Sequence, residues 1–285
     1  MRSIILSSPA KLNLFLKVLE KRSDGYHGLK TVFERISLCD DIRFKSTKSD
    51  QIKITCDHPH VPVGPKNLVY QVAQLLRKDY GIEKGVEIDI TKRIPVAAGL
   101  AGGSSNAATA LLGLNRLWGI NLTKKTLIEY GKRVGSDVPF FLHDCSWGLG
   151  THRGDHIKPL SVDAKMWHIL VVPRIKMYSG EVFARFKMKL TKQGDDVNIL
   201  LRSLRKCNIY KVTEFLSNDL EQSILQIRPG LIRVKKRLES FLSQGVCFSG
   251  SGPAVFGITS SKKEAENIKA VLKKRYSQVF VVQTL

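Results

Sequence analysis

The sequence predicts an α+β protein, and three observations carry this prediction. First, 43% of the 285 residues are hydrophobic, which is enough for a substantial core. Second, strand patterns recur along the chain, over residues 4–19, 41–57, 84–92, 167–173 and 279–282. Third, helical patterns alternate with them, over residues 67–80, 107–118, 123–134, 178–186, 190–225, 230–242 and 264–276. The C-terminal half therefore has a βαβ-like order.

Residues 4–19 are predicted to form two strands on either side of Ser8-Pro9-Ala10. The alternating pattern puts the side chains of Lys11 and Asn13 on one face. Ser8 and Lys11 also match the S-x-x-K pattern of acyl-serine enzymes. However, the partner patterns S-D-N and K-T-G are absent from the sequence, and Pro9 does not suit the helix that this chemistry needs. We therefore set that chemistry aside.

A turn at Asp24-Gly25 leads into Tyr26 and His27. These two residues are either half-buried strand residues or a binding face, because an aromatic ring beside a hydrogen-bonding ring suits a flat base. Further along, Asn67 is a good N-cap residue for the helix that follows it.

The stretch from Ile94 to Asn115 has no charged side chain, although a quarter of the protein is charged. Gly99, Gly102 and Gly103 allow close backbone approach, and residues 104–106 are good N-cap types before a helix. Such a turn aims unpaired N–H groups at one point, so we predict a phosphate-binding loop. A turn whose glycines serve only close packing is the alternative. Neither G-x-x-x-x-G-K-[ST] nor a helix-opening G-x-G-x-x-G occurs.

Downstream of this loop, the helix over 123–134 is expected to begin at a Thr123 cap and to end at Gly135. Asp137 precedes Val-Pro and is either a helix cap or a reactive carboxylate. The glycine-rich residues 146–158 are expected to connect two halves of the chain. Residues 245–256 predict a strand, a glycine turn and a second strand.

Three of these segments resemble, in the same order, the motifs of the GHMP small-molecule kinases, which include galactokinase, homoserine kinase and mevalonate kinase. The segments are Pro9–Asn13, Pro95–Ser105 and Gly250–Gly252, and Gly135–Pro139 resembles the family's G-[AS]-D-V-P. The resemblance implies that ATP contacts Asn67, Pro95, Val96, Ala97, Ala98, Gly99, Leu100, Ala101, Gly102, Gly103, Ser104, Ser105 and Asn106. It also implies that Gly250, Ser251 and Gly252 form a turn against the phosphate loop.

The segment Asp24–Phe33 resembles the D-G-Y-H-x-L-x-T-V-F signature of one branch of this family, whose alcohol substrate carries a cytidine diphosphate head. The resemblance implies that Tyr26 and His27 hold the cytosine, and that Asn13 and Asp137 also contact this substrate. It implies that Asp137 is the catalytic base and that Lys11 orients it and stabilises charge.

The resemblance implies a two-domain fold, with a ribosomal-S5-like, nucleotide-binding half over 1–157 and a ferredoxin-like half over 158–285. The implied reaction uses ATP with Mg²⁺ to phosphorylate the 2-hydroxyl of 4-diphosphocytidyl-2-C-methyl-D-erythritol, in non-mevalonate isoprenoid synthesis. The same fold acting on another alcohol is the nearest alternative. Ala101, Arg174 and residues 150–155 depart from the family pattern. The last two of these departures leave the contacts with the acceptor open. The Mg²⁺ ligands and the oligomeric state are open as well.

The charge of the chain favours a second class of function, because 46 Lys and Arg residues against 25 Asp and Glu residues give a net charge of +21. Such a field attracts polyanions, so a nucleic-acid-binding protein is the alternative of another class. The basic residues are spread along the chain, with no arginine-rich run and no RNP, zinc-finger or KH pattern. We therefore expect no nucleic-acid partner.

The cysteines and histidines predict no metal site. The five cysteines (39, 56, 145, 207 and 247) are scattered without C-x-x-C, so we expect free, buried thiols. His58-Pro-His60 and His152-x-x-x-His156 lie in loop-like sequence without further ligands at metal-binding spacing. The N-terminus has too few consecutive apolar residues for a signal peptide, and no apolar segment is long enough to span a membrane. We therefore expect a cytoplasmic protein.

Overall fold

The computed structural model describes residues 2–188, 196–242 and 245–285. The chain forms two compact units that are interleaved in sequence. The first unit contains Met1–Ala10, Leu38–Val96 and Ala101–Asp144, and the second contains Lys11–Ser37, Ala97–Leu100 and Cys145–Leu285. The domain boundary that the family resemblance implied, between residues 157 and 158, stays a prediction.

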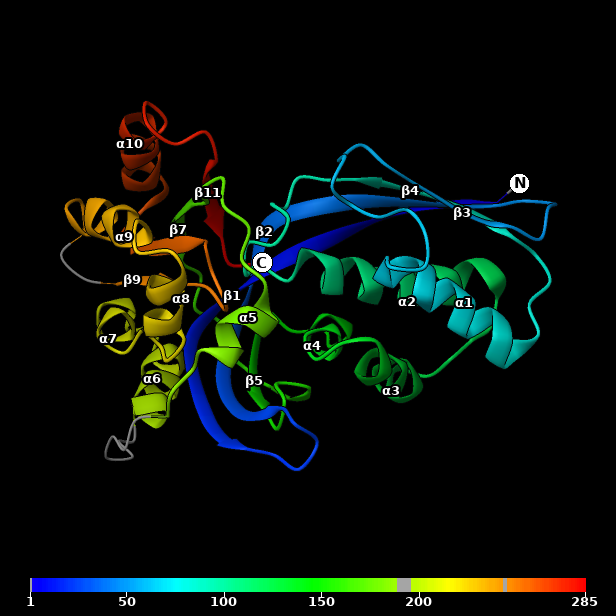
Figure 1. Ribbon diagram of the computed structural model, residues 1–285, viewed down its shortest axis with the longest axis horizontal. Coiled ribbons are helices and arrows are strands. Elements are labelled where there is room, and N and C mark those ends of the chain that lie inside the picture. Colours follow the sequence, from blue (N-terminus) through cyan, green and yellow to red (C-terminus); the bar gives the residue numbers. More distant parts are fainter. Residues whose placement is uncertain (1, 189–195, 243–244) are drawn as a thin grey trace. The chain divides into compact units, whose positions relative to one another are not determined.

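Two long strands, β1 (Ser3–Lys21) and β2 (His27–Ser46), each contribute residues to both units (Figure 1). The prediction of two strands over residues 4–19 is wrong, because β1 runs through Pro9 without a break. Proline is tolerated where a strand has an open side, since it cannot donate to a neighbour. Among the described residues, β8 (Ser217–Asn218) pairs with β1 only at Phe15 and Leu16, which leaves that side open at Pro9.

In the first unit, helices cover a sheet built from the end of β2, β4 (Val86–Thr91) and β3 (Ile52–Cys56). Strand β4 is antiparallel to β2 and parallel to β3. Helices α1 (Leu68–Tyr80) and α2 (Gly102–Trp118) lie next to the sheet, and α3 (Lys124–Val134) and α4 (Val138–Leu142) pack on α2 on the side away from it (Figure 1). A Cβ at Gly113 would lie 2.5 Å from the Phe44 ring, so this glycine lets α2 pack closely on the sheet.

In the second unit, four antiparallel strands follow the order β11-β7-β10-β9. Their bounds are β7 (Trp167–Val171), β9 (Val246–Phe248), β10 (Val255–Thr259) and β11 (Val279–Gln283). Helices α9 (Leu231–Glu239) and α10 (Lys262–Leu272) pack on this sheet, and Leu238 and Ile268 share a buried cluster with Phe248 (Figure 1). This strand order is that of the split βαβ, ferredoxin-like motif, as predicted.

Short elements complete the second unit. They are the strands β5 (Trp147–Thr151) and β6 (His156–Pro159) and the helices α5 (Ser179–Ala184), α6 (Asp196–Arg205), α7 (Ile209–Glu214) and α8 (Glu221–Ile227). Strands β5 and β6 form an antiparallel hairpin. Residues 146–158, which were expected to connect the two halves, therefore belong to the second unit and have strand structure of their own. Of the helical prediction over 190–225, residues 190–195 lie outside the described part of the chain, and the rest forms α6 to α8 with β8 between them.

Among the residues that the structure describes, no helix combines the length and the apolar character that crossing a membrane requires. All five cysteines are free thiols. Only Cys247 is fully buried, whereas Cys207 is exposed.

Candidate functional site

The predicted phosphate loop leads into α2, but that helix begins earlier than expected. It starts at Gly102, with Ala101 at the N-cap position in a left-handed conformation (φ 54°) and no side-chain cap. The prediction that residues 104–106 cap the helix is therefore wrong. Ser105 and Asn106 turn their side chains to the buried Ser8 hydroxyl instead. The first-turn amides, which lack intrahelical partners, are consequently those of residues 102–104.

The tip of the loop, Ala97–Leu100, belongs to the second unit and packs there on the Gly250–Gly252 turn. Gly99 has φ +78°, and a Cβ on it would lie 2.1 Å from the backbone oxygen of Ser249. Ser249 also donates from its hydroxyl to the Gly99 oxygen at 3.0 Å, and the Ala254 amide donates to the Ala98 oxygen at 3.2 Å. Only glycine at position 99 permits this approach.

Lys11 and Asn13 lie together above the same glycine turn. Lys11 is buried, and its ammonium donates to the Asn13 side-chain oxygen. Asn13 in turn donates to the Thr31 hydroxyl at 2.8 Å, and that hydroxyl donates to the Phe15 oxygen at 2.7 Å. A Cβ at Gly250 would lie 3.2 Å from Asn13 Oδ1 and 3.3 Å from Lys11 Nζ. The lysine is thus held by a chain of hydrogen bonds in the second unit.

Asp137 lies in the first unit, immediately before α4. It occupies the N-cap position, but its half-buried side chain makes no capping hydrogen bond to this helix within the described structure. Because Lys11 belongs to the other unit, the pairing of Asp137 with Lys11 stays a prediction.

Tyr26 and His27 join an aromatic group in the second unit. The Tyr26 side chain is 56% exposed, and the Arg153 guanidinium lies 5.1 Å from its ring centre. The His27 ring stacks on Phe183 at 6.0 Å between centroids and meets the edge of Phe186 at 5.9 Å. Sequence reasoning missed Arg153, Phe183 and Phe186. All three residues are far from Tyr26 in the sequence. The only sequence signal was the i,i+3 spacing of the two phenylalanines, which would place their side chains on one face of a helix.

Charge pairing fixes Arg153 beside Tyr26. Its guanidinium donates to the buried Asp155 carboxylate at 2.9 Å. Burial raises the pKa of Asp155, but the hydrogen bond and the charge of Arg153 outweigh it, so the pKa lies below its usual value. The Asp155 hydrogen bond raises the pKa of Arg153. Both groups are therefore charged near neutral pH. Residues 150–155, which depart from the family pattern, supply this arginine from the β5–β6 turn.

Asn67 caps α1, as predicted: its side-chain oxygen accepts from the Val69 amide at 2.8 Å. Its side-chain nitrogen donates to the Pro62 oxygen at 2.6 Å. The side chain is thus used for local structure, and its contact with ATP stays a prediction.

The two histidine pairs noted in the sequence are close in space. The ring centroids of His58 and His60 are 5.6 Å apart, and those of His152 and His156 are 3.8 Å apart. Within the described ranges, no group of three histidine, cysteine or acidic side chains could hold a metal ion.

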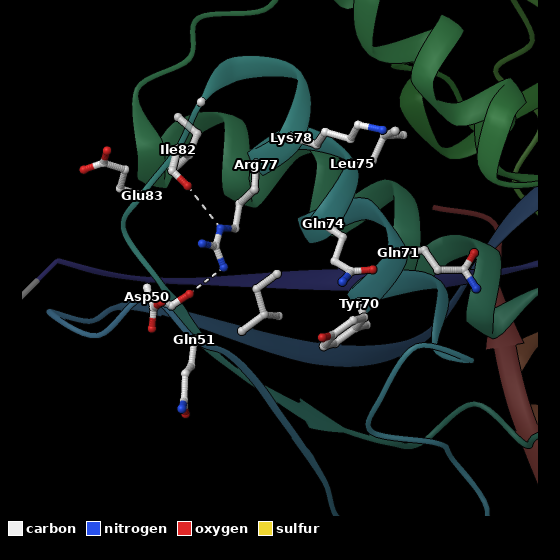
Figure 2. A pocket seen from close by; sticks show the side chains of 12 residues that line it. Asp50, Gln51, Tyr70, Gln71, Gln74, Leu75, Arg77, Lys78, Ile82 and Glu83 are labelled. Carbon is white, nitrogen blue, oxygen red and sulfur yellow. Dashed lines mark hydrogen bonds between the residues drawn. The ribbon is translucent and has the colours of Figure 1, made fainter.

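A groove on the first unit lies between α1 and the start of β3, as Figure 2 shows. Arg77 bridges its end by donating to the backbone oxygens of Ile82 and Asp50 (Figure 2). None of the described residues that line this groove is a predicted site residue. We therefore do not place the reaction there.

Comparison with known proteins supports the motif resemblance. The model described as GHMP kinases N terminal domain matches residues 67–144, and the model described as GHMP kinases C terminal matches residues 212–278. A 4-diphosphocytidyl-2-C-methyl-D-erythritol kinase from Bacillus subtilis (strain 168) is 38% identical over 285 residues, which cover 99% of this chain and 97% of that protein. The kinase of the same name from Enterococcus faecalis (strain ATCC 700802 / V583) is 38% identical, with 99% of both chains covered.

Solved structures share the fold. The crystal structure of a 4-(cytidine 5'-diphospho)-2C-methyl-D-erythritol kinase superimposes with a TM-score of 0.84 at 29% identity, covering 99% of this chain and 100% of that one. A homoserine kinase from Cytophaga hutchinsonii has a TM-score of 0.77 at 19% identity, covering 100% of this chain and 95% of that one. The second match is a likeness of fold alone.

Proposed function

This chain belongs to the GHMP kinase family, and from that premise we propose that it transfers the γ-phosphoryl group of ATP to the 2-hydroxyl of 4-diphosphocytidyl-2-C-methyl-D-erythritol. Members of the family use ATP as the phosphoryl donor. The main observation in favour of this acceptor is the aromatic group around Tyr26 and His27. In addition, the chain resembles kinases of cytidylylated alcohols along nearly its whole length.

The phosphates of ATP bind at the 95–106 loop in this proposal. The first-turn amides of α2 point out of the helix end, where the helix dipole also favours negative charge. Gly103 supports this role, because a Cβ there would meet no atom within 4 Å. The backbone of the helix start is thus open to a phosphate oxygen.

Asp137 acts as the base that accepts the proton of the substrate hydroxyl. A carboxylate must come within about 3 Å of that hydroxyl to take its proton. Lys11 supplies a positive charge that offsets the charge of the phosphoryl group in transfer. The Asn13–Thr31 hydrogen bonds hold that ammonium in place.

Mg²⁺ accompanies ATP in this proposal, and we assign it no protein ligand. Within the described ranges no cluster of three ligating side chains exists, which fits an ion held mainly by phosphate oxygens and water. When bound, the ion would neutralise phosphate charge during transfer.

The cytosine of the acceptor is held by the exposed ring of Tyr26 and by His27. Tyr26 offers a stacking face, and the Arg153 guanidinium fixed beside it adds positive charge toward the diphosphate. Phe183 and Phe186 hold the His27 ring from two directions, so its nitrogens keep a defined orientation for hydrogen bonds to the base.

The test compares acceptors. ATP consumption by the purified chain should require the cytidylylated alcohol, and 2-C-methyl-D-erythritol 4-phosphate, which lacks the cytidine head, should be a poor substrate. Equal turnover of both alcohols would refute the acceptor assignment and leave a GHMP kinase for another alcohol.

We also propose that the basic surface has no nucleic-acid partner and that the enzyme works in the cytoplasm, where ATP is available. A gel-shift titration with DNA and RNA at several salt concentrations tests the first point. Binding that keeps micromolar affinity at physiological salt would contradict it.

A further inference from the structure

Asp40 is a fully buried carboxylate near the middle of β2, in the first unit. Its Oδ1 atom accepts from the backbone amides of Arg93 and Ile94, both at 2.8 Å. Its Oδ2 atom accepts from the Asn106 side-chain nitrogen at 2.9 Å and from the Lys92 ammonium, with which it forms a buried ion pair. Both oxygens are therefore fully used as acceptors.

These donors all belong to the two flanks of the phosphate loop. Arg93 and Ile94 immediately precede Pro95, where the loop begins, and Asn106 is its last residue. One carboxylate therefore ties the entry of the loop to its exit. The same contacts join the loop to β2, which is part of a packed sheet.

Further buried groups extend this connection. The second hydrogen of the Asn106 amide is donated to the Ser8 hydroxyl at 2.9 Å, and Ser8 lies 2.8 Å from the Ser105 hydroxyl. Ser8 and Ser105 are both fully buried. The first turn of α2 is consequently held from β1 through Ser8 and from β2 through Asp40.

The ion pair also lies directly against the start of α2. A Cβ at Gly102 would be 3.0 Å from the Ile94 side chain and 3.1 Å from Lys92 Nζ. Movement of Lys92 or Ile94 would therefore move the first-turn amides. An apolar residue at position 40 could fill the same space, but it could not accept from two backbone amides and an amide side chain.

We propose that Asp40 is a positioning residue for nucleotide binding, which acts through the Arg93 and Ile94 amides and through Asn106 to hold the phosphate loop in its binding shape. The proposal rests on the proposed role of this loop in ATP binding. Because Asp40 is fully buried, its proposed effect is on the loop.

The test is Asp40→Asn, which keeps the size of the side chain. The new amide can keep one oxygen on the Arg93 and Ile94 amides, but its NH₂ group then faces two donors, Lys92 and Asn106. Asp41→Asn is the matched control, because the neighbouring carboxylate undergoes the same chemical change while it pairs with the exposed Arg93 side chain at 2.7 Å.

The readouts are the dissociation constant of a non-hydrolysable ATP analogue by calorimetry, the KM values of ATP and acceptor, and the melting temperature. Asp40→Asn should raise the ATP dissociation constant and KM by about tenfold or more and leave the acceptor KM within about twofold of wild type. Asp41→Asn should leave all three constants within about twofold.

Two outcomes would overturn the inference. One is a folded Asp40→Asn protein with unchanged ATP affinity, and the other is equal loss for ATP and acceptor, which a merely structural role would give. If Asp40→Asn does not fold, Ser8→Ala decides, because it leaves Asp40 in place and removes the hydrogen bonds of Ser8 to Asn106 and Ser105 at the start of α2. It should raise the ATP dissociation constant by about threefold or more, and an unchanged value would overturn the inference. The dissociation constant of the ATP analogue needs no acceptor, so this readout stands apart from the identity of the acceptor.

Discussion

The substitution Gly103→Val tests most directly whether the predicted loop binds phosphate. Gly103 is the second residue of α2, it is exposed, and a Cβ added to it meets no atom within 4 Å. Valine is also a better helix former than glycine by roughly a few tenths of a kcal/mol. Gly103→Val should therefore fold and melt at or slightly above the wild-type temperature.

The same substitution should weaken ATP binding, because its methyl groups occupy the space in front of the first-turn amides. Loss of one hydrogen bond between an amide and a charged phosphate costs about 1.5–3 kcal/mol, which corresponds to roughly a 10- to 150-fold rise in the ATP dissociation constant. Calorimetry with a non-hydrolysable ATP analogue measures this constant, and differential scanning fluorimetry measures the melting temperature.

Gly99→Ala provides the contrast. Its backbone has φ +78°, and the new methyl group would lie 2.1 Å from the Ser249 oxygen. The left-handed conformation alone costs about 1–2 kcal/mol for alanine, and the clash adds to it. Gly99→Ala should thus melt several degrees lower. If Gly103→Val keeps wild-type ATP affinity, the loop is only a structural turn and the reasoning is refuted.

Three further predictions concern other parts of the protein. Asp137→Ala should lower kcat by about 10²-fold or more with ATP affinity nearly unchanged, and a folded variant with near-normal turnover would remove the base assignment. Tyr26→Ala should raise the acceptor KM roughly 5- to 150-fold, because base stacking is worth about 1–3 kcal/mol. The acceptor KM of the control variant Tyr26→Phe should stay near the wild-type value. An equal rise in the ATP KM of Tyr26→Ala would contradict the assignment. At pH 8.5 iodoacetamide should modify the exposed Cys207 and spare Cys247, since burial raises the pKa of the Cys247 thiol to about 12. Because folding raises the pKa of this thiol, the protonated thiol contributes fully to stability below the pKa of the unfolded thiol, and this contribution is lost as the pH rises toward 12. The free energy of unfolding should therefore fall over that pH range. Rapid labelling of Cys247 in the folded protein would refute the assignment of a buried thiol with a raised pKa.

Local signals in the sequence predicted much of the fold. The Asn67 and Thr123 caps lie where they were expected, because each side chain accepts a hydrogen bond from an amide two or three residues away. The helix that ends at Gly135 also agrees with the sequence pattern. These features depend on short-range geometry and on apolar periodicity, which a single sequence displays directly.

The errors arose where distant partners decide the local structure. Ser105 and Asn106 have the chemistry of helix caps, but buried partners on β1 and β2 use their side chains, so α2 begins at Gly102. Strand β1 continues through Pro9, where proline is tolerated because β8, in the described part of the chain, pairs with β1 only at Phe15 and Leu16. The glycine-rich residues 146–158 form a hairpin, which their composition does not distinguish from a connecting loop.

The candidate site could be predicted only as far as its motifs extend. Tyr26 and His27 stand in a recognisable segment, but Arg153 and Phe183 reach them from other elements. Asp40 gives no signal in the sequence, since it directly precedes the strand pattern over 41–57 and stands beside another aspartate. Its burial and its four donors are visible only in three dimensions.

The absence of charge on the loop and the burial of the Asp40–Lys92 pair have related physical causes. A phosphate site built from backbone amides needs no cationic side chain on the loop, but it works only while the backbone keeps its shape. Glycine-rich chain loses the most conformational entropy when it is fixed, so other residues must hold it. In the first unit Asp40 holds the flanks, and in the second unit Ser249 holds the tip. Substitutions at residues that do not contact ATP should therefore change ATP affinity more than the chemical step.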